Sequence, residues 1–449
     1  MKLTLTQHND GHSLVAWNEQ ANITHAQFLA DVMHVAEHLP NKQYAINLCE
    51  DRYHFMVSFA AIIVKGQTNL LPQNRVIETL YAVAEDYNDS YCITEEKLTG
   101  LKLTQLDVSE LFKKENKFTQ SKNTIKTPAI DSELIAAIAF TSGSTGKPQG
   151  NSKTWKALVM GAEMAAERFG LDKKPTYIVS TVPPQHMYGL ETSILYSLQN
   201  TCPVYAGRPF YPEDIRRVTE TAPQAVILIT TPIHLRACAA SENLQWNNIG
   251  FIISATAPLR NEVAMQVEDK MRATVKEIFG CTEVGSMASR ETLKEQIWQL
   301  YKGIRIYQAD GKAYIDTPYM DKDIALNDVV KIEDEHHFKL LGRDEDMVNV
   351  AGKRGSLSDL KLKLESIEGV DDAVVYLPED NNEISRLTAF VVTENLTPKQ
   401  ISAELAQKVD SVFIPRPIYK VKSLPYNKTG KLTRQSLIEL SCQCKFKIV

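Results

Sequence analysis

The residues with the clearest capacity for chemistry lie at positions 141–150, in the run TSGSTGKPQG. Glycines lack a Cβ atom, so neighbouring backbone N–H groups can close around phosphate oxygens, while hydroxyl groups add donors and a lysine adds positive charge. The run follows a strand-like segment and precedes a helix-like one. The sequence therefore predicts a phosphate-binding loop between a strand and a helix, made by Thr141, Ser142, Gly143, Ser144, Thr145, Gly146 and Lys147.

This loop does not have the spacing of a Walker A motif. The interval from Gly143 to Lys147 is too short for G-x-x-x-x-G-K, and Pro148 stands where that motif has a Mg²⁺-binding Ser or Thr. A P-loop kinase or ATPase is therefore disfavoured. A flexible Ser/Gly turn is the plainer alternative, but it does not explain the density of hydroxyl and glycine residues.

A second segment, FGCTE at 279–283, places a threonine and a carboxylate after another strand-like run. The anionic oxygens of Glu283 suit a hard cation such as Mg²⁺ beside a triphosphate. On its own, a Thr-Glu pair after a strand is more often the start of a helix. Its combination with the loop at 141–150 favours a nucleotide and metal site.

Taken with the order of the later motifs, the run at 141–150 closely resembles the signature of the adenylate-forming superfamily, which contains acyl-CoA synthetases, luciferases and peptide-synthetase adenylation domains. The resemblance covers nearly the whole chain. It implies that Glu283 helps to hold Mg²⁺ and that Thr282 contacts the adenylate phosphate. The other implied nucleotide contacts are Thr256, Ala257 and Pro258 at adenine, Phe279, Gly280 and Cys281 in the motif ending at Glu283, and Asp328 and Arg343 at the ribose.

Two C-terminal motifs extend the resemblance. The segment LPYNKTGKLTR at 424–434 matches the family's closing motif, which makes Lys431 the implied adenylation lysine. Its ammonium group would bridge the attacking carboxylate and the α-phosphate. The segment VAGKR at 350–354 resembles the loop that lines the pantetheine tunnel, where Gly352 allows close backbone approach. Without these neighbours, Lys431 would be interpreted as a solvated surface residue.

The segment PPQHMYGL at 183–190 resembles the family's Pro-x-x-His-x-x-Gly motif. The resemblance places His186 near the channel for the acid and the acceptor, with a structural histidine as the alternative. The identity of the acid depends on how the fold arranges His186, Tyr188 and Glu191, which the sequence does not specify.

Strand-like and helix-like segments alternate along the chain, which is typical of βα units around a sheet. The expected strands include 44–50, 134–140, 177–181, 225–230 and 249–254, and the expected helices are 24–39, 152–170 and 258–273. After residue 300, shorter strand-like pieces indicate an antiparallel lobe, and after residue 346 a small α+β domain. The sequence predicts an α/β fold: a large N-terminal domain of several subdomains and a small mobile C-terminal domain, as in acyl-CoA synthetases.

The expected domains are 1–342, which would bind ATP and the acid, and 347–449, a lid that carries the lysine, with a hinge at 343–346. The chain departs from the family at three positions: Glu345 stands in the hinge, Asn327 replaces a glycine and Gln149 replaces a lysine. These departures bear on domain rotation and on the acceptor rather than on adenylate formation.

Bulk composition limits the classes of partner. A chain of 449 residues with 43% hydrophobic content is long enough to bury two or three cores, and its net charge of −5 does not favour binding to nucleic acid or a membrane surface. Seven scattered cysteines indicate a reducing compartment, and the N-terminus has no signal-like or membrane-spanning segment, so we expect a cytoplasmic protein.

The resulting hypothesis is an ATP- and Mg²⁺-dependent ligase that converts a small carboxylic acid, fatty or aryl, into an acyl-AMP. The acyl group would then pass to a pantetheine thiol of coenzyme A or an acyl carrier protein. The alternative is a non-catalytic acyl-adenylate-binding protein that has kept the fold, against which the presence of Lys431 and Glu283 argues.

Overall fold

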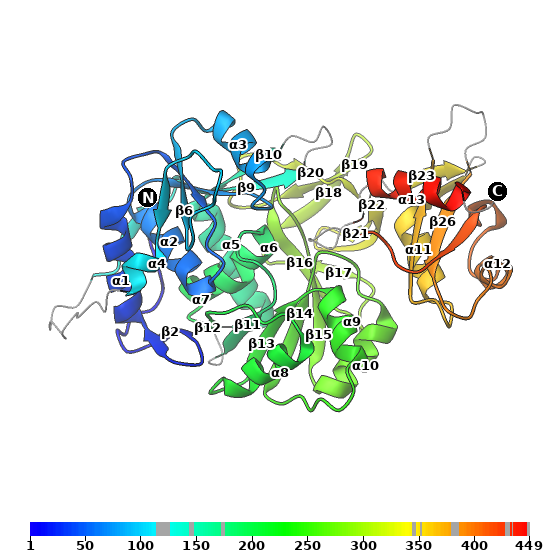
Figure 1. The fold of residues 1–449 in the computed structure, drawn as a ribbon, viewed down its shortest axis with the longest axis horizontal. Helices are drawn as coiled ribbons and strands as arrows, with labels where there is room; N and C mark the ends of the chain where they lie inside the picture. Colours follow the sequence, from blue (N-terminus) through cyan, green and yellow to red (C-terminus); the bar gives the residue numbers. More distant parts are fainter. Residues whose placement is uncertain are drawn as a thin grey trace. The chain divides into compact units, whose positions relative to one another are not determined.

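The computed structural model describes residues 1–113, 126–142, 148–171, 176–343, 347–350, 353–378, 386–426, 432 and 434–446. The chain packs into two compact units, which Figure 1 traces from the N-terminus to the C-terminus. The first unit comprises Met1–Arg305 and Asp316–Ile324, and the second comprises Ile306–Ile315 and Ala325–Val449.

One sheet of the first unit has the strand order β10-β9-β5-β4-β6-β7. All neighbours in it are parallel except β9 and β10, which form an antiparallel pair. Apolar side chains such as Ile46, Leu70 and Ile138 form its core, together with Leu80 and Val83 of α3. The bounds are β4 (Tyr44–Asn47), β5 (Thr68–Leu71), β6 (Ser90–Thr94), β7 (Gln105–Asp107), β9 (Ile135–Ser142), β10 (Pro148–Thr154) and α3 (Ile77–Asp86).

The strands of a second sheet that belong to this unit have the order β17-β16-β15-β14-β13-β11-β12-β2-β3. Its central strands β11, β13, β14 and β15 are parallel. Strands β11, β13 and β14 are nearly continuous apolar runs, as expected for strands covered on both faces, whereas β15 also contains Thr274, Lys276 and Glu277. The bounds are β2 (Leu14–Trp17), β3 (Asn22–Thr24), β11 (Tyr177–Ser180), β12 (Val204–Tyr205), β13 (Val226–Thr230), β14 (Ile249–Ser254), β15 (Thr274–Cys281), β16 (Gly285–Glu291) and β17 (Trp298–Leu300).

Helices α8, α9 and α10 lie together on one face of these parallel strands (Figure 1). Val218, Leu235 and Val267, one from each helix, are buried against Leu228 and Ile252 of the sheet. This amphipathic packing confirms the expected βα units. The remaining helical segments and outlying strands of the unit are α1 (His25–His38), α2 (Arg52–Val64), α4 (Ser109–Lys113), α5 (Trp155–Phe169), α6 (Met187–Gly189), the π-helix η1 (Leu190–Leu195), α7 (Tyr196–Gln199), α8 (Pro212–Thr221), α9 (Pro232–Ala240), α10 (Asn261–Met271), β1 (Lys2–Thr4) and β8 (Ala129–Asp131).

The expected context of the loop at 141–150 was wrong in one respect. The loop does not lead into a helix: β10 follows it and returns antiparallel to β9, with Ser142 opposite Pro148 and Thr141 opposite Gln149. Helix α5 begins only at Trp155, where the Thr154 hydroxyl accepts from the amide of Ala157 as an N-cap. Within this segment Gly150, Asn151 and Ser152 are poor helix formers, and the segment completes the ladder to β9 instead.

The second unit contains the antiparallel pairs β21–β22 and β23–β24 and a sheet of order β25-β26-β27. Strands β25 and β26 are antiparallel and pack with α11 and α12 around Leu364, Ala389 and Ile401. The bounds are β18 (Arg305–Ala309), β19 (Lys312–Asp316), β20 (Ile324–Ala325), β21 (Asp328–Asp334), β22 (His337–Arg343), β23 (Met347–Val350), β24 (Lys353–Ser356), α11 (Leu357–Glu365), β25 (Asp372–Tyr376), β26 (Thr388–Val392), α12 (Pro398–Ala406), the 3₁₀ turn η3 (Ser411–Phe413), β27 (Ile418–Val421) and α13 (Arg434–Phe446).

The packing division precedes the expected hinge at 343–346. The sequence assigned the hairpin β21–β22 to the N-terminal domain. In the structure its residues fall in the second compact unit. Residues 344–346 lie outside the described part of the chain, so the hinge itself stays a prediction. Among the residues that the structure describes, no helix combines the length and apolar composition needed to cross a bilayer.

Candidate active site

The predicted site residues of the first unit follow the carboxyl ends of its parallel strands. The segment with His186 follows β11, Thr256 follows β14, and Thr282 and Glu283 follow β15. Parallel strands end at the same edge of a sheet, and open α/β sheets bind ligands outside that edge. The topology therefore gathers motifs that are far apart in the sequence.

Tyr188 joins two of these strand ends. Its hydroxyl donates toward the carbonyl oxygens of Thr230, at 3.1 Å, and Ile253, at 3.0 Å, which lie near the ends of β13 and β14. Burial raises the pKa of Tyr188, so the hydroxyl stays protonated as a donor. The ring is thereby fixed beside the edge of the sheet, where it can form a wall for a ligand.

His186 lies in a compact turn that explains the spacing of its motif. Its amide donates to the carbonyl of Pro183 at 3.3 Å, and its own carbonyl accepts from Leu190 at 2.8 Å. A Cβ atom at Gly189 would lie 2.0 Å from the Pro183 carbonyl oxygen, so a side chain at this position would break the turn. The π-helix η1 follows directly, a form of helix that is frequent at functional sites.

Buried Arg52, which the sequence reading did not single out, holds the chain where β11 ends. Its guanidinium donates to the carbonyls of Ser180 and Val182, both at 2.9 Å, and to the Ser193 hydroxyl at 2.6 Å. Burial, and next the charge of Arg208, lower the pKa of Arg52 to about 9. No sequence pattern distinguishes this arginine, because its partners, two main-chain carbonyls and one hydroxyl, lie more than a hundred residues away.

The FGCTE segment forms a tight hairpin and not the start of a helix. Strands β15 and β16 pair with Gly280 opposite Ser286 and Cys281 opposite Gly285, leaving Thr282 and Glu283 at the turn. A Cβ atom at Gly280 would lie 2.4 Å from the Gly285 carbonyl oxygen, so the close pairing requires glycine. Burial, and next the charge of Glu283, raise the pKa of the Cys281 thiol to about 12.

Two charged residues hold this hairpin from either side. Lys153 of β10 donates from Nζ to the carbonyl oxygen of Glu283. The Glu191 carboxylate of η1 accepts from the Ser286 amide at 3.1 Å and also from the Ser286 hydroxyl. Sequence reasoning missed Lys153 entirely and named Glu191 only as part of an unspecified pocket. Their contacts with the hairpin are tertiary and leave no periodic signal.

The loop at 255–258 has a strained backbone. Thr256 has a φ of +81°, in the region that β-branched residues rarely adopt. Thr256, Ala257 and Pro258 are exposed, and the loop is held at its far end by Glu277, whose carboxylate accepts from the Leu259 amide at 3.0 Å. Strain of this kind is concentrated at ligand-binding sites. The small exposed side chains leave space for a flat ring, as a site for adenine requires.

Glu277 is itself held by an ion pair. It is 2% exposed, and Arg290 donates to it at 2.6 and 2.9 Å. The Arg290 guanidinium also lies 4.7 Å from the centre of the Trp298 ring, which packs against Phe279 with 5.6 Å between ring centres. The loop at 255–258 and the FGCTE motif are therefore both connected to the Glu277–Arg290 ion pair, the motif through Trp298.

Several predicted residues lie at or beyond the limits of the description. Thr141 and Ser142 end β9, and the Thr141 hydroxyl donates to the Gln149 carbonyl at 3.5 Å. The other predicted phosphate-loop residues, together with Gly352 and the adenylation lysine, lie outside the described residues: Gly143, Ser144, Thr145, Gly146, Lys147, Gly352 and Lys431.

In the second unit, the structure brings Asp328 and Arg343 together. They are register partners on the antiparallel strands β21 and β22, and their role at the ribose stays a prediction. The segment that precedes Lys431 is also anchored: the Tyr426 hydroxyl donates to the Asp372 carboxylate at 3.0 Å and accepts from Lys361 at 3.3 Å. These contacts hold the chain around Tyr426 in place within the second unit.

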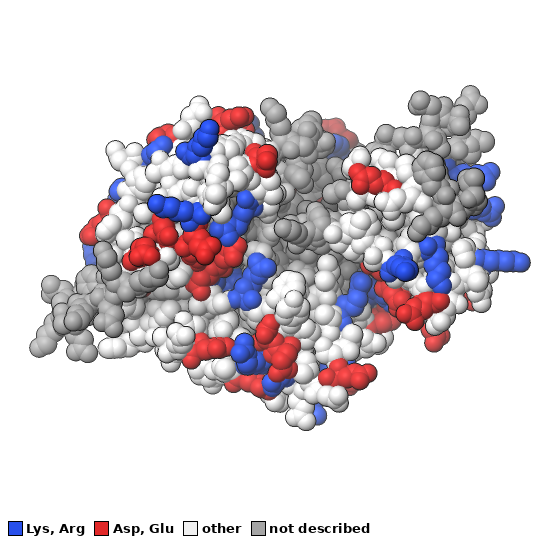
Figure 2. Space-filling view, viewed as in Figure 1, with Lys and Arg blue, Asp and Glu red and all other residues white. Residues whose placement is uncertain are grey.

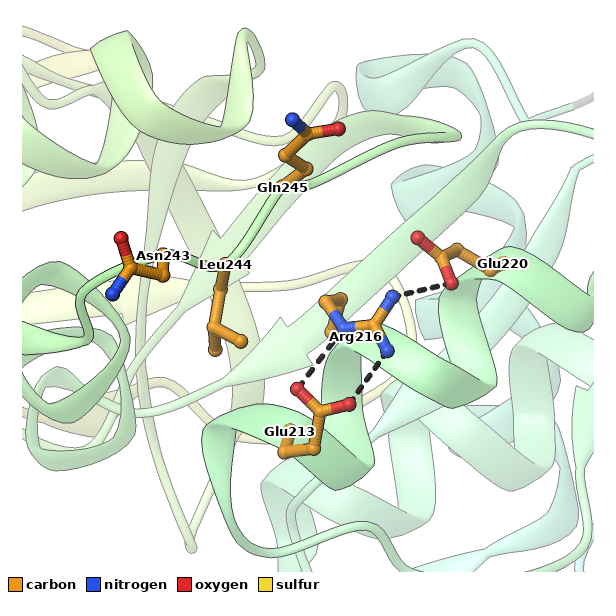
Figure 3. A pocket seen from close by; sticks show the side chains of 6 residues that line it. All are labelled: Glu213, Arg216, Glu220, Asn243, Leu244 and Gln245. Carbon is orange, nitrogen blue, oxygen red and sulfur yellow. Dashed lines mark hydrogen bonds and ion pairs between the residues drawn. The ribbon is translucent and has the colours of Figure 1, made fainter.

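Two cavities differ in their relation to these residues. A cavity of about 310 Å³ is lined by Lys153, Val284 and Tyr319 and so adjoins the hairpin. A shallower hollow of about 400 Å³ lies beside α8, where Arg216 pairs with Glu213 and Glu220 (Figure 3). The one guanidinium of the second hollow is already paired with its two carboxylates, and the hollow contains no predicted site residue. We therefore assign the chemistry to the carboxyl edge.

Comparison with known proteins agrees with this geometry. A sequence model of the AMP-binding enzyme family matches residues 4–305. A 3,4-dihydroxybenzoate–[aryl-carrier protein] ligase of Bacillus anthracis is 23% identical over 313 residues, which cover 68% of this chain and 74% of that protein. A 2-succinylbenzoate–CoA ligase of Listeria innocua is 22% identical over 336 residues, which cover 69% and 71%.

Solved structures confirm the predicted fold class. ATP-bound MatB from Rhodopseudomonas palustris superimposes with a TM-score of 0.83 at 18% identity, covering 97% of each chain. The o-succinylbenzoate coenzyme A synthetase MenE from Bacillus subtilis, in complex with ATP and a magnesium ion, gives a TM-score of 0.80 at 18% identity, covering 95% of this chain and 97% of that one.

Proposed function

The chain belongs to the AMP-binding enzyme family, and from this premise we propose that it joins a carboxylic acid to a pantetheine thiol at the expense of ATP. In the first half-reaction, a carboxylate oxygen attacks the α-phosphorus of ATP and the bond to pyrophosphate breaks. In the second, the thiolate sulfur attacks the acyl carbon and AMP leaves. Coenzyme A or the pantetheine arm of a carrier protein supplies the thiol.

The observation that carries this proposal is the hairpin that presents Thr282 and Glu283 at the carboxyl edge of the sheet. Lys153 donates to the main-chain carbonyl of Glu283, and in this proposal the side-chain carboxylate of the same residue faces the ligand. A carboxylate there fits Mg²⁺, which prefers oxygen ligands and is commonly held by one or two carboxylates plus substrate phosphates. When bound, the metal supplies positive charge to the phosphate oxygens.

The chain's own residues bind, orient and neutralise charge. Thr282 donates its hydroxyl to the α-phosphate, and the strained Thr256 loop receives the adenine. Asp328 accepts from the ribose hydroxyls together with a donation from Arg343. Lys431 supplies the ammonium that offsets charge at the α-phosphate, and Gly352 lines the route of the thiol. The two halves use different faces of the C-terminal domain, exchanged by rotation about 343–346.

We propose an aryl acid as the substrate class. Two relatives carry names that specify aromatic acids, a dihydroxybenzoate and a succinylbenzoate. The Tyr188 ring, fixed by its contacts with two strand ends, offers a flat wall that suits an aromatic ring. Fatty acids would instead need a longer apolar channel.

Acid-dependent exchange between ATP and pyrophosphate tests the proposal. The full chain would be assayed with Mg²⁺ and a panel of benzoates, short-chain acids and fatty acids. Exchange that appears only with an acid, and most strongly with a benzoate, is the expected result. Tight ATP binding without exchange for any acid would favour the non-catalytic alternative. Exchange restricted to fatty acids would overturn the substrate class while leaving the reaction intact.

A further inference from the structure

Neither Lys153 nor Glu191 is among the residues assigned above to the nucleotide, the metal or the thiol, yet both contact the hairpin that carries Glu283. Lys153 is 4% exposed and lies near the end of β10. The register of β10 with β9 shifts between Lys153 and Thr154. An irregularity of this kind changes the direction in which a side chain leaves the strand. The ammonium therefore leaves the strand pair and reaches the Glu283 carbonyl.

Glu191 holds the other end of the same turn. Both carboxylate oxygens lie 3.1 Å from the Ser286 amide nitrogen. Gly285 has a φ of +104°, and a Cβ atom there would lie 2.3 Å from the Glu191 Oε1 atom. The carboxylate thus occupies the space that a side chain at position 285 would need. The approach of Glu191 to the hairpin therefore requires glycine at this position.

The two charges also balance each other. Lys153 and Glu191 carry opposite charges and contact the same short turn. Burying two charges of opposite sign costs desolvation free energy, so replacing them with neutral groups of similar size is often tolerated. Stability alone therefore does not explain why two opposite charges should hold one short turn.

We propose that Lys153 and Glu191 are positioning residues that fix the Thr282–Glu283 turn for Mg²⁺·ATP. The inference rests on the proposed function, because it takes Glu283 as the group that faces the metal. Lys153 fixes the carbonyl of Glu283 and Glu191 fixes the amide of Ser286, so the turn between them cannot shift. Residues that orient a metal-facing group from outside commonly change metal affinity by about 10- to 100-fold when replaced.

The test compares Lys153→Met, the double variant Lys153→Met/Glu191→Gln and the control Lys322→Met. Lys322 lines the same cavity but is exposed. Calorimetric titration would measure the binding of ATP with Mg²⁺ and of ATP with a chelator, and thermal unfolding would measure stability. Neither measurement needs the acid or the thiol.

For Lys153→Met we expect Mg²⁺·ATP affinity to fall about 10-fold or more, metal-free ATP affinity to stay constant and stability to drop, because Glu191 loses its counter-charge. The double variant removes both charges and should regain stability while keeping the weak Mg²⁺·ATP binding. If Lys153→Met alone does not fold, the Mg²⁺·ATP affinity of the double variant is compared with that of the unmodified protein instead. The control should match the unmodified protein.

Two outcomes would overturn the proposal. If the double variant regains both stability and Mg²⁺·ATP affinity, the pair serves only to balance charge. If Lys153→Met weakens ATP equally with and without Mg²⁺, the lysine does not act through the metal-facing turn. Failure of the proposed function is a separate result: it would appear as absent acid-dependent exchange in the unmodified protein, whatever the binding data show.

Discussion

The proposed function gives Glu283 two roles, since its main chain lies in the turn and its side chain is taken to face the metal. Glu283→Gln keeps the carbonyl that Lys153 holds but removes the negative charge. We expect the free energy of unfolding to change little, the Mg²⁺ concentration for half-maximal exchange to rise, and the exchange rate to fall on the order of 10²-fold. A Mg²⁺ titration of pyrophosphate exchange measures both effects.

A suitable control for this prediction is Glu262→Gln, since Glu262 is an exposed carboxylate in the first turn of α10. It should leave the titration unchanged. Should Glu283→Gln retain full activity with the same metal dependence, Glu283 would be a turn residue without a role at the metal.

Lys431 lies outside the described residues, so its role is a prediction from the motif alone. Lys431→Ala should lower adenylate formation by on the order of 10²- to 10³-fold, because the charge at the α-phosphate is no longer offset. Transfer of the acyl group from supplied acyl-AMP to the thiol should persist. Rapid-quench measurement of each half-reaction separates the two, with Lys399→Ala as an exposed control in the same unit. Equal loss of both halves would contradict the use of two conformations.

At the scale of elements, strands with continuous apolar runs were predictable and the surroundings of the phosphate loop were not. The runs that became β11, β13 and β14 are buried on both faces, so their composition alone distinguishes them. The polar segment of β10 has no such pattern and becomes a strand only because β9 lies beside it. Pairing between segments decides such cases, and pairing is invisible to local propensity.

The candidate site shows the same division. Motif residues such as Glu283 and Thr256 could be named because their spacing is characteristic. Lys153, Arg52 and Glu277 act through single tertiary contacts, so no spacing identifies them. The glycines of the hairpin can be seen in the sequence, but the sequence does not show why they are needed. The structure gives the cause: Glu191 approaches Gly285, and the opposite strand approaches Gly280.

Gly285 gives the element-scale prediction. Gly285→Ala combines a left-handed backbone with a Cβ atom 2.3 Å from Glu191 Oε1, so it should destabilise the chain by about 2–4 kcal/mol and weaken Mg²⁺·ATP binding. Gly66→Ala isolates the backbone term, because Gly66 has a φ of +78° with nothing within 4 Å of its Cβ position. It should cost about 1 kcal/mol. Urea unfolding of both variants measures the difference; equal losses would show that Glu191 yields easily.

At the scale of the molecule, His8 links the N-terminal segment to the interior. It is 4% exposed, with Nε2 3.0 Å from the Ser197 carbonyl and Nδ1 2.9 Å from the Ser13 hydroxyl. Burial lowers the pKa of His8 to about 4 from 6.5. Between these values the unfolded chain binds a proton that the folded chain does not, so the free energy of unfolding falls as pH falls, by up to about 3 kcal/mol.

Urea unfolding at pH 7 and pH 5 tests this dependence. His8→Gln removes the titrating group, so its stability should differ less between the two pH values than that of the unmodified protein. His12→Gln, at an exposed position, should show the full difference. If His8→Gln and the unmodified protein lose stability in parallel on acidification, other groups cause the loss.

Charge distribution over the chain bears on the thiol acceptor. Acidic and basic side chains are interspersed over the face in Figure 2, in keeping with a net charge of −5. The last stretch of the chain, 416–449, is different: it has one acidic residue, Glu439, and eight basic residues, which are Arg416, Lys420, Lys422, Lys428, Lys431, Arg434, Lys445 and Lys447. Such a concentration favours a polyanionic partner, and both coenzyme A and an acidic carrier protein qualify.

Lys420 and Lys422 are the members best suited to a test, since both are exposed at or next to the end of β27. Charge reversal at both should raise the KM for the acceptor roughly tenfold at low salt and leave acid-dependent pyrophosphate exchange intact. The defect should shrink as salt rises, because screening weakens the attraction that the reversals remove. Reversal at Lys399 and Lys408, exposed lysines outside the stretch, is the control.

The KM is measured with coenzyme A and with a carrier protein in turn. The acceptor whose KM changes more, and with the stronger dependence on salt, is the one that the basic stretch attracts. An unchanged KM for both would mean that this stretch does not guide the acceptor.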